Sequence, residues 1–216
     1  MPIPTLFAGL LNAHGQLGPA EIPAKSRWMA KDVLRKAALL GVTLERPASH
    51  PFKPLLSLRI SSLDMSEGTR RRLIDGLFRA TWAQTADVSD PTVVARVADE
   101  AGLDGEQAVR EASSEAIKAR LREQTQAAVE VGVFGVPTFV VVASELFWGY
   151  DDLPMLERYL RGEDPLDRKK LEALDRHSPK RATQTPRRVV GLRCYQSSLP
   201  GSPLNGPTMA DVIQPP

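Results

Sequence analysis

Cysteine and histidine are scarce in this chain of 216 residues, and each scarcity argues against a class of chemistry. The single cysteine, Cys194, allows no disulfide within the chain and no Cys-x-x-Cys redox pair. The three histidines are scattered without the spacing of metal ligands, so we expect no bound metal. A dithiol redox enzyme and a metalloprotein are therefore both disfavoured.

Long apolar runs and an excess of one charge are also lacking. Residues 1–11 are apolar, but they are too short to span a bilayer and lack the basic start of a secretory signal. The net charge is +2, from 28 basic and 26 acidic side chains, so we expect neither nucleic acid nor a membrane as a partner. The length suits one domain with an insertion, and we expect a cytoplasmic location.

Hydrophobic periodicity divides the chain into a strand, a helical block, a hairpin and a tail. Residues 3–7 predict a short strand, followed by an irregular loop over 11–19. Apolar residues then recur at three- and four-residue steps, so that residues ~24–131 are predicted to be almost entirely helical. The pattern is interrupted at the proline-rich stretch 47–54.

Capping residues predict where individual helices begin and end. Ser66, Asp90 and Asp104 each precede a helical pattern as an N-cap, and Asp90 is followed by proline. A longer helix is expected from about Ser114, and Gly132 follows its end.

The period changes after residue 132. Residues 138–142 are β-branched and aromatic, which is typical of a buried strand, and 145–148 predict a second strand. Asp151 or Asp152 is expected to cap a last amphipathic helix. A strand, a helical block, a hairpin and a helix together predict an α/β core with a helical insertion.

The segment 132–139, Gly-Val-Phe-Gly-Val-Pro-Thr-Phe, contains the motif that indicates chemistry. It resembles the cis-proline segment of thioredoxin-like proteins, in the version found in the 2-hydroxychromene-2-carboxylate isomerase family and the kappa-class glutathione transferases. A cis bond before Pro137 would turn the backbone of Val136 toward the active site, where an extended peptide such as glutathione can pair with it. The alternative is an ordinary tight loop before a strand.

A second segment, 145–151, resembles the Phe-Trp-Gly-x-Asp segment of the same family. The resemblance implies that Asp151, with the backbone of Tyr150, holds the γ-glutamyl end of glutathione. A carboxylate suits the ammonium group of that end. The alternative is that Asp151 is only an N-cap.

Two upstream segments complete the resemblance, which covers residues ~3–172. Gln16 stands where relatives have an asparagine that contacts glutathione. Lys53 stands in a segment similar to the family's Pro-Phe-Asn and could bind a substrate carboxylate; a solvated surface lysine is the alternative. Trp82 and Trp148 are interpreted as core residues rather than substrate contacts.

The resemblance implies a thioredoxin-like core at 1–19 and 133–172, a helical insertion at 20–132 and a disordered tail at 173–216. The tail is rich in proline, serine and glycine. Its basic residues could serve as an anchor, and a frameshifted or foreign C-terminus is a further interpretation.

The first strand and helix of the core are interpreted as missing, with the true start upstream as the favoured explanation and a fragment as the alternative. In relatives, the loop between that strand and helix carries the serine that activates the glutathione thiol. No serine here lies in such a context, so no catalytic residue is identified.

Three functions remain open. The first is a glutathione-dependent isomerase of 2-hydroxychromene-2-carboxylate-type aromatic compounds, inactive if this chain is truncated. The second is a kappa-type glutathione transferase. The third is a non-catalytic thioredoxin-fold binding module. Glutathione is the expected cofactor, a small aromatic molecule the expected substrate, and a homodimer one open alternative because relatives are commonly dimeric.

Overall fold

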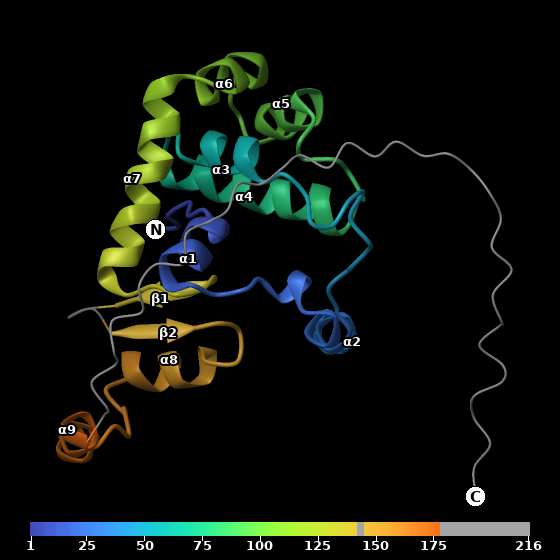
Figure 1. Cartoon of the computed structure of the whole chain (residues 1–216). Helices are drawn as coiled ribbons and strands as arrows, with labels where there is room; N and C mark the ends of the chain where they lie inside the picture. The colour runs from blue at the N-terminus through green and yellow to red at the C-terminus, as the bar shows by residue number, and fades with distance from the viewer. Residues whose placement is uncertain (142–144, 178–216) are drawn as a thin grey trace, which may run out of the picture.

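Helices dominate the fold, which we describe from a computed structural model over residues 1–141 and 145–177 (Figure 1). The helices and strands in chain order are α1 (Phe7–His14), the 3-10 helix η1 (Pro19–Glu21), α2 (Pro23–Leu40), α3 (Leu55–Ser61), α4 (Glu67–Trp82), α5 (Pro91–Glu100), α6 (Gly105–Ala112), α7 (Glu115–Val131), β1 (Thr138–Val140), β2 (Leu146–Trp148), α8 (Leu153–Leu160) and α9 (Arg168–His177).

Helices α3 to α7 form a body with its own hydrophobic core, and α7 runs along one side of it (Figure 1). The predicted caps are confirmed: Ser66, Asp90, Asp104 and Ser114 each accept a hydrogen bond from a backbone N–H in the first turn of the following helix. The largest completely buried aliphatic side chains of this core are Ile60, Leu73 and Val94, each 0% exposed. Burial of this apolar surface is the main stabilising contribution to the body.

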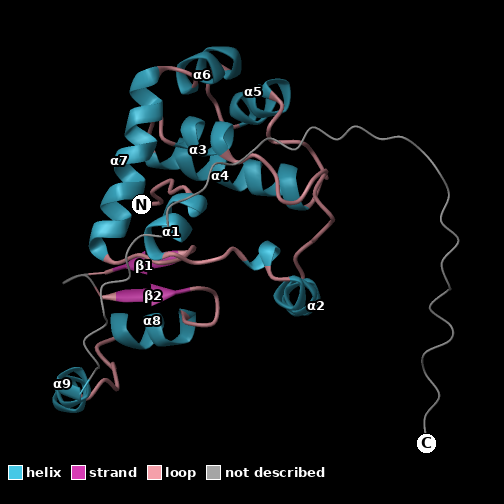
Figure 2. Ribbon diagram, in the orientation of Figure 1, coloured by secondary structure: helices cyan, strands magenta, loops and turns pink. Residues whose placement is uncertain are grey.

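The two strands form an antiparallel hairpin that lies between α1 and α8 (Figure 2). Its register pairs Thr138 with Trp148 and Val140 with Leu146. On one side Phe147 is buried, and its ring lies 5.3 Å from that of Tyr159 in α8. The prediction of a buried strand over 138–142 is wrong for the part that is described, because Phe139 and Val140 are 39% and 50% exposed. Residues 142–144 lie outside the described residues.

The predicted strand at 3–7 is also wrong. Residues 3–6 belong to no strand, and the helix α1 extends into the first part of the predicted loop at 11–19, as far as His14. The reason is tertiary: Leu10 is completely buried where α1 packs on α7, and the backbone N–H of Leu6 donates to Thr125 Oγ1 at 3.1 Å. A five-residue alternation of apolar side chains could not reveal this docking.

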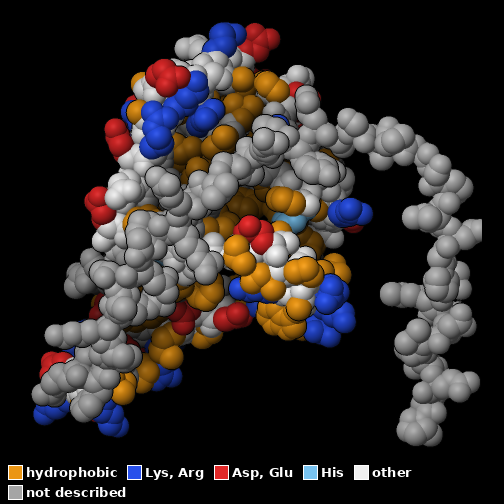
Figure 3. Space-filling model, in the orientation of Figure 1, with side chains coloured by type: hydrophobic (Ala, Val, Ile, Leu, Met, Phe, Trp, Pro, Cys, Tyr) orange, Lys and Arg blue, Asp and Glu red, His pale blue; other side chains and the backbone are white. Residues whose placement is uncertain are grey.

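Helix α2 is correctly predicted but buries nothing. It ends at Gly41, which adopts a left-handed conformation with φ 63°. None of its residues is buried, and Trp28 and Leu39 are 60% and 86% exposed. Hydrophobic and basic side chains therefore lie side by side on the surface over α2 (Figure 3).

The division into core and insertion stays a prediction, although α1 of the predicted core packs directly on α7 of the predicted insertion. Helix α9 continues to His177, beyond the expected core boundary at 172, so the first residues of the predicted tail are helical. The rest of that tail, including Cys194, lies outside the described residues. Over 1–141 and 145–177, no helix is long and apolar enough to cross a membrane.

Candidate functional site

The loop between α7 and β1 exposes a backbone that is available for pairing. The peptide bond between Val136 and Pro137 is cis, as the resemblance implied. Val136 is 44% exposed, and no hydrogen bond engages its backbone among the described residues. One hydrogen bond connects the residues that flank Val136 and Pro137: Thr138 Oγ1 donates to the carbonyl of Gly135 at 2.7 Å.

Trp148 and Phe134 brace this loop. Their rings lie 5.1 Å apart, and Gly135 passes so close to the indole that a Cβ there would lie 2.5 Å from Trp148 Nε1. Trp148 is 50% exposed. The interpretation of Trp148 as a core residue is therefore wrong: it supports the loop from the surface side of the hairpin.

The hairpin register brings the second predicted segment to the same place. The N–H of Gly149 donates to the carbonyl of Pro137 at 2.9 Å, which extends the pairing of Thr138 with Trp148 by one residue. Val136 and Tyr150 therefore follow at the same end of the hairpin.

Asp151 does not act as the predicted N-cap. Its carboxylate makes no capping bond to α8, and its Oδ1 instead accepts from Lys36 Nζ at 2.8 Å. The side chain of Asp152 does not cap α8 either, since its Oδ2 accepts from the N–H of Trp148 at 2.9 Å. This bond fixes the turn that presents Asp151, whose side chain is 80% exposed.

Lys36 is a site residue that sequence reasoning missed. It extends from α2, and its ammonium bridges Asp151 and Asp32, with a distance of 3.0 Å to Asp32 Oδ2. It also lies 5.3 Å from the ring centroid of Tyr150. The hydrogen bond to Asp151, followed by that to Asp32, raises the pKa of Lys36 above its usual value. The spacing of Asp32 and Lys36 on one helix was visible in the sequence, but the contact with Asp151 was not.

His14, two residues before Gln16, contacts the segment that leads into the Val136 loop. His14 Nε2 is 3.0 Å from the carbonyl oxygen of Val133, which joins the end of α1 to the start of the Val136 loop. Gln16 follows Gly15, the left-handed end of α1, and its side chain is exposed. The register of the hairpin places Val136 and the segment of Asp151 at the same end, whereas no contact among the described residues joins Gln16 to either of them.

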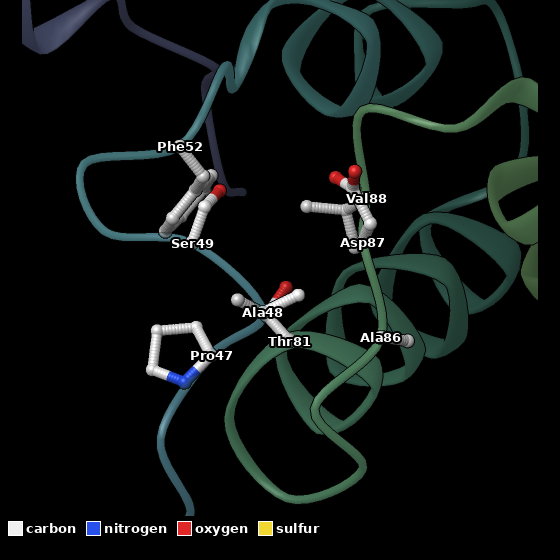
Figure 4. A pocket seen from close by; sticks show the side chains of 8 residues that line it. All are labelled: Pro47, Ala48, Ser49, Phe52, Thr81, Ala86, Asp87 and Val88. Atoms are coloured by element: carbon white, nitrogen blue, oxygen red, sulfur yellow. The ribbon is translucent and has the colours of Figure 1, made fainter. Parts of the chain in front are cut away.

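Lys53 lies in a different part of the fold. It follows the loop 47–52, which with the end of α4 and residues 86–88 lines a shallow surface hollow (Figure 4). Its positive charge contributes to lowering the pKa of Asp87, although hydrogen bonds from Ser89 are the larger cause. Trp82 is half-buried here, with its ring 6.1 Å from that of Phe52 and 6.0 Å from that of His50. No contact among the described residues joins Lys53 to the Val136 loop.

Metal chemistry finds no support in the part of the chain that is described. Residues 1–141 and 145–177 contain no cluster of three or more histidine, cysteine, aspartate or glutamate side chains able to hold a metal ion. The side chains that do meet, Lys36, Asp151 and Asp32, suit recognition of a charged peptide head group instead.

Comparisons with known proteins identify the family and the fold. The model of the DSBA-like thioredoxin domain matches residues 3–161. A 2-hydroxychromene-2-carboxylate isomerase of Pseudomonas putida is 31% identical over 148 residues, which cover 67% of this chain and 71% of that protein. Glutathione S-transferase kappa 1 of Homo sapiens is 26% identical over 174 residues, covering 73% and 75% respectively.

A solved structure of a 2-hydroxychromene-2-carboxylate isomerase superposes with a TM-score of 0.67 at 27% identity, covering 81% of this chain and 82% of that one. The relatives are enzymes named as isomerases or glutathione transferases. With a family model that spans most of the described residues and a matching fold, this chain belongs to the DSBA-like thioredoxin domain family.

Proposed function

We propose that this protein is a glutathione-dependent isomerase that acts on 2-hydroxychromene-2-carboxylate-type aromatic compounds. The observation that carries the proposal is Val136, an exposed residue whose backbone forms no hydrogen bond with the described residues, at the hairpin end where Asp151 also lies. The isomerase relatives, at 30% to 31% identity, support the choice of reaction.

The residues fit glutathione as an extended peptide. The N–H and C=O of Val136 would pair with its main chain, as a strand pairs with an exposed sheet edge. Asp151, with one carboxylate oxygen bonded to Lys36, would receive the γ-glutamyl ammonium on the other. Gln16 would offer an amide to the same peptide, and Pro137 limits the conformations of the loop.

Glutathione, when bound, supplies a thiol that adds reversibly to a conjugated double bond, which lets that bond rotate before the thiol leaves. The chain's own contribution is to hold the peptide in one orientation, which lowers the entropic cost of the encounter. Lys53 would bind the carboxylate of the aromatic substrate.

Thermal unfolding with and without millimolar glutathione tests binding first. A ligand at 100 times its Kd adds about 2.7 kcal/mol to the free energy of unfolding, which corresponds to a rise of several degrees in Tm. Asp151→Asn should reduce the rise. Glu163→Gln, an exposed carboxylate away from the site, should leave it unchanged. An unfolding transition indifferent to glutathione would contradict the proposal.

The reaction itself is tested by product analysis. An isomerase returns glutathione unchanged after turnover of the aromatic substrate, whereas a kappa-type transferase accumulates a conjugate with an external electrophile. The transferase is the second candidate because Glutathione S-transferase kappa 1 of two mammals is among the relatives. Binding of glutathione without either activity would indicate the third candidate, a non-catalytic binding module.

A further inference from the structure

The ammonium group of Lys36 can donate one more hydrogen bond than its contacts in this structure use. An ammonium has three N–H donors, and two are used by Asp32 Oδ2 and Asp151 Oδ1. The side chain of Lys36 is 29% exposed, so solvent and small ligands can reach it. The ring of Tyr150, with its centroid 5.3 Å from Nζ, lies beside the ammonium at the end of the hairpin.

The second carboxylate oxygen of Asp151 can accept a hydrogen bond from a ligand. Only Oδ1 receives a hydrogen bond from the described residues, and the side chain is 80% exposed. A donor that approaches Oδ2 therefore meets a free carboxylate oxygen, while an acceptor that approaches from the same side meets Lys36 Nζ. A ligand with an ammonium and a carboxylate on one carbon atom is complementary to this arrangement of charges.

We propose that Lys36 is a specificity-determining residue that binds the α-carboxylate of an α-amino acid head group whose ammonium is bound by Asp151. The inference rests on the proposed function, because the γ-glutamyl end of glutathione is such a head group. It adds a residue from α2, outside the segments that carried the family resemblance to the glutathione site.

The charges explain why the pair would select a zwitterion. A simple amine bound at Asp151 would lie close to the positive charge of Lys36, which Asp32 offsets only in part, and would leave the third N–H donor of Lys36 unused; a simple carboxylate at Lys36 would meet Asp151 and Asp32. A head group with both charges forms one attractive contact with each side. Rejection of ligands with a single charge is therefore as important as attraction of the correct one.

Calorimetric titration of the full chain with three peptides tests the proposal. Glutathione has both head-group charges, 4-aminobutanoyl-cysteinylglycine lacks the α-carboxylate, and glutaryl-cysteinylglycine lacks the ammonium. We expect Lys36→Met to weaken glutathione binding by about three- to tenfold. The same substitution should leave the aminobutanoyl peptide bound equally or more tightly. Asp151→Asn should weaken glutathione and spare the glutaryl peptide.

Two further variants separate recognition from mere positioning. Lys31→Met removes an exposed lysine from the same helix and should change none of the affinities. Lys36→Arg keeps the charge and should retain most of the affinity for glutathione.

Each failure has a distinct meaning. If the wild-type chain binds glutathione but Lys36→Met binds it equally well, the role of Lys36 is wrong and the proposed function stands. If Lys36→Met weakens glutathione and the aminobutanoyl peptide alike, Lys36 only positions α2, and the inference is likewise overturned. If the wild-type chain binds none of the three peptides, both proposals fail.

Discussion

Arg120 shows how a single side chain joins distant parts of the helical body. From α7 it donates to the carbonyl of Ser62 at 2.9 Å and to both carboxylate oxygens of Asp64 at 2.8 and 3.0 Å. Asp64 lies in the connection between α3 and α4. The hydrogen bond from Arg120 is the main cause that lowers the pKa of Asp64 below its usual value.

This pair predicts a pH dependence of stability. A carboxyl group whose pKa is depressed by folding stabilises the folded state above its unfolded pKa of ~3.9, and this contribution is lost as the pH falls through the folded value. We expect the Tm of Asp64→Asn to fall less than that of wild type between about pH 6 and about pH 2.5. Asp75→Asn is the control, because Asp75 is exposed and forms no ion pair with an arginine or lysine among residues 1–141 and 145–177. Parallel curves for wild type and Asp64→Asn would contradict the assignment.

Gly135 predicts the cost of a single added methyl group in the candidate site. A Cβ at this position would lie 2.5 Å from Trp148 Nε1 and 3.0 Å from Cε2, so the indole would have to move. We expect Gly135→Ala to lower the free energy of unfolding by about 1–3 kcal/mol and to weaken glutathione binding. Gly68→Ala in α4 is the matched control, since the nearest atom to its Cβ would be Arg72 Nη1 at 3.6 Å. Equal free energies of unfolding for the two variants would show that the loop or the indole can move to accommodate the added methyl group.

At the scale of elements, α1 and α7 depend on one close contact. Gly9 lies so near α7 that a Cβ there would be 2.7 Å from Thr125 Cγ2. The hydroxyl of Thr125 accepts from the N–H of Leu6 and donates to the carbonyl of Leu121. The Thr125 side chain therefore sets the distance between α1 and α7 and also links the two helices by a hydrogen bond.

Thr125→Val tests this element contact with little change of shape. The valine leaves the N–H of Leu6 without its acceptor, and we expect the free energy of unfolding to fall by about 1–3 kcal/mol. Thr69→Val in the first turn of α4, where the side chain is on the surface, should cost less. The measurement is chemical denaturation monitored by circular dichroism. An unchanged midpoint for Thr125→Val would mean that α1 is held by the burial of Leu10 alone.

The whole molecule combines a packed helical body with one helix that buries nothing. Helix α7 contains Ile117, Leu121 and Thr125 among its buried residues, whereas α2, of similar length, contains none. Lys36 provides the ion pair by which α2 meets the end of the hairpin. Exposed ion pairs contribute little free energy, so this contact does not replace a packed interface.

Hydrogen exchange should reveal this difference. We expect the amides of α2 to exchange much faster than those of α7, because few buried apolar contacts oppose local opening of α2. Mass spectrometry of peptides from the two helices measures both in one sample, with α7 as the internal control. Equal protection of α2 and α7 would show that another surface covers α2 in solution.

The sequence by itself determined the helical body. Ser66, Asp90, Asp104 and Ser114 begin their helices where predicted, because capping is a local bond between a side chain and its own first turn. The hairpin and the Val136–Pro137 segment were also predicted, since turn residues and β-branched runs act over a few positions. The family resemblance supplied the assembly of these elements into a thioredoxin-like fold.

Only the tertiary structure decided what depends on contacts between distant residues. Residues 3–7 do not form a strand: a helix that packs on α7 begins at Phe7, its Leu10 is completely buried, and the N–H of Leu6 donates to Thr125. Asp151 is bonded to Lys36 rather than capping α8, and Trp148 braces Gly135 on the surface instead of filling the core. In each case the partner lies far along the chain, and a residue's local pattern contains no information about which distant group will be near it in space.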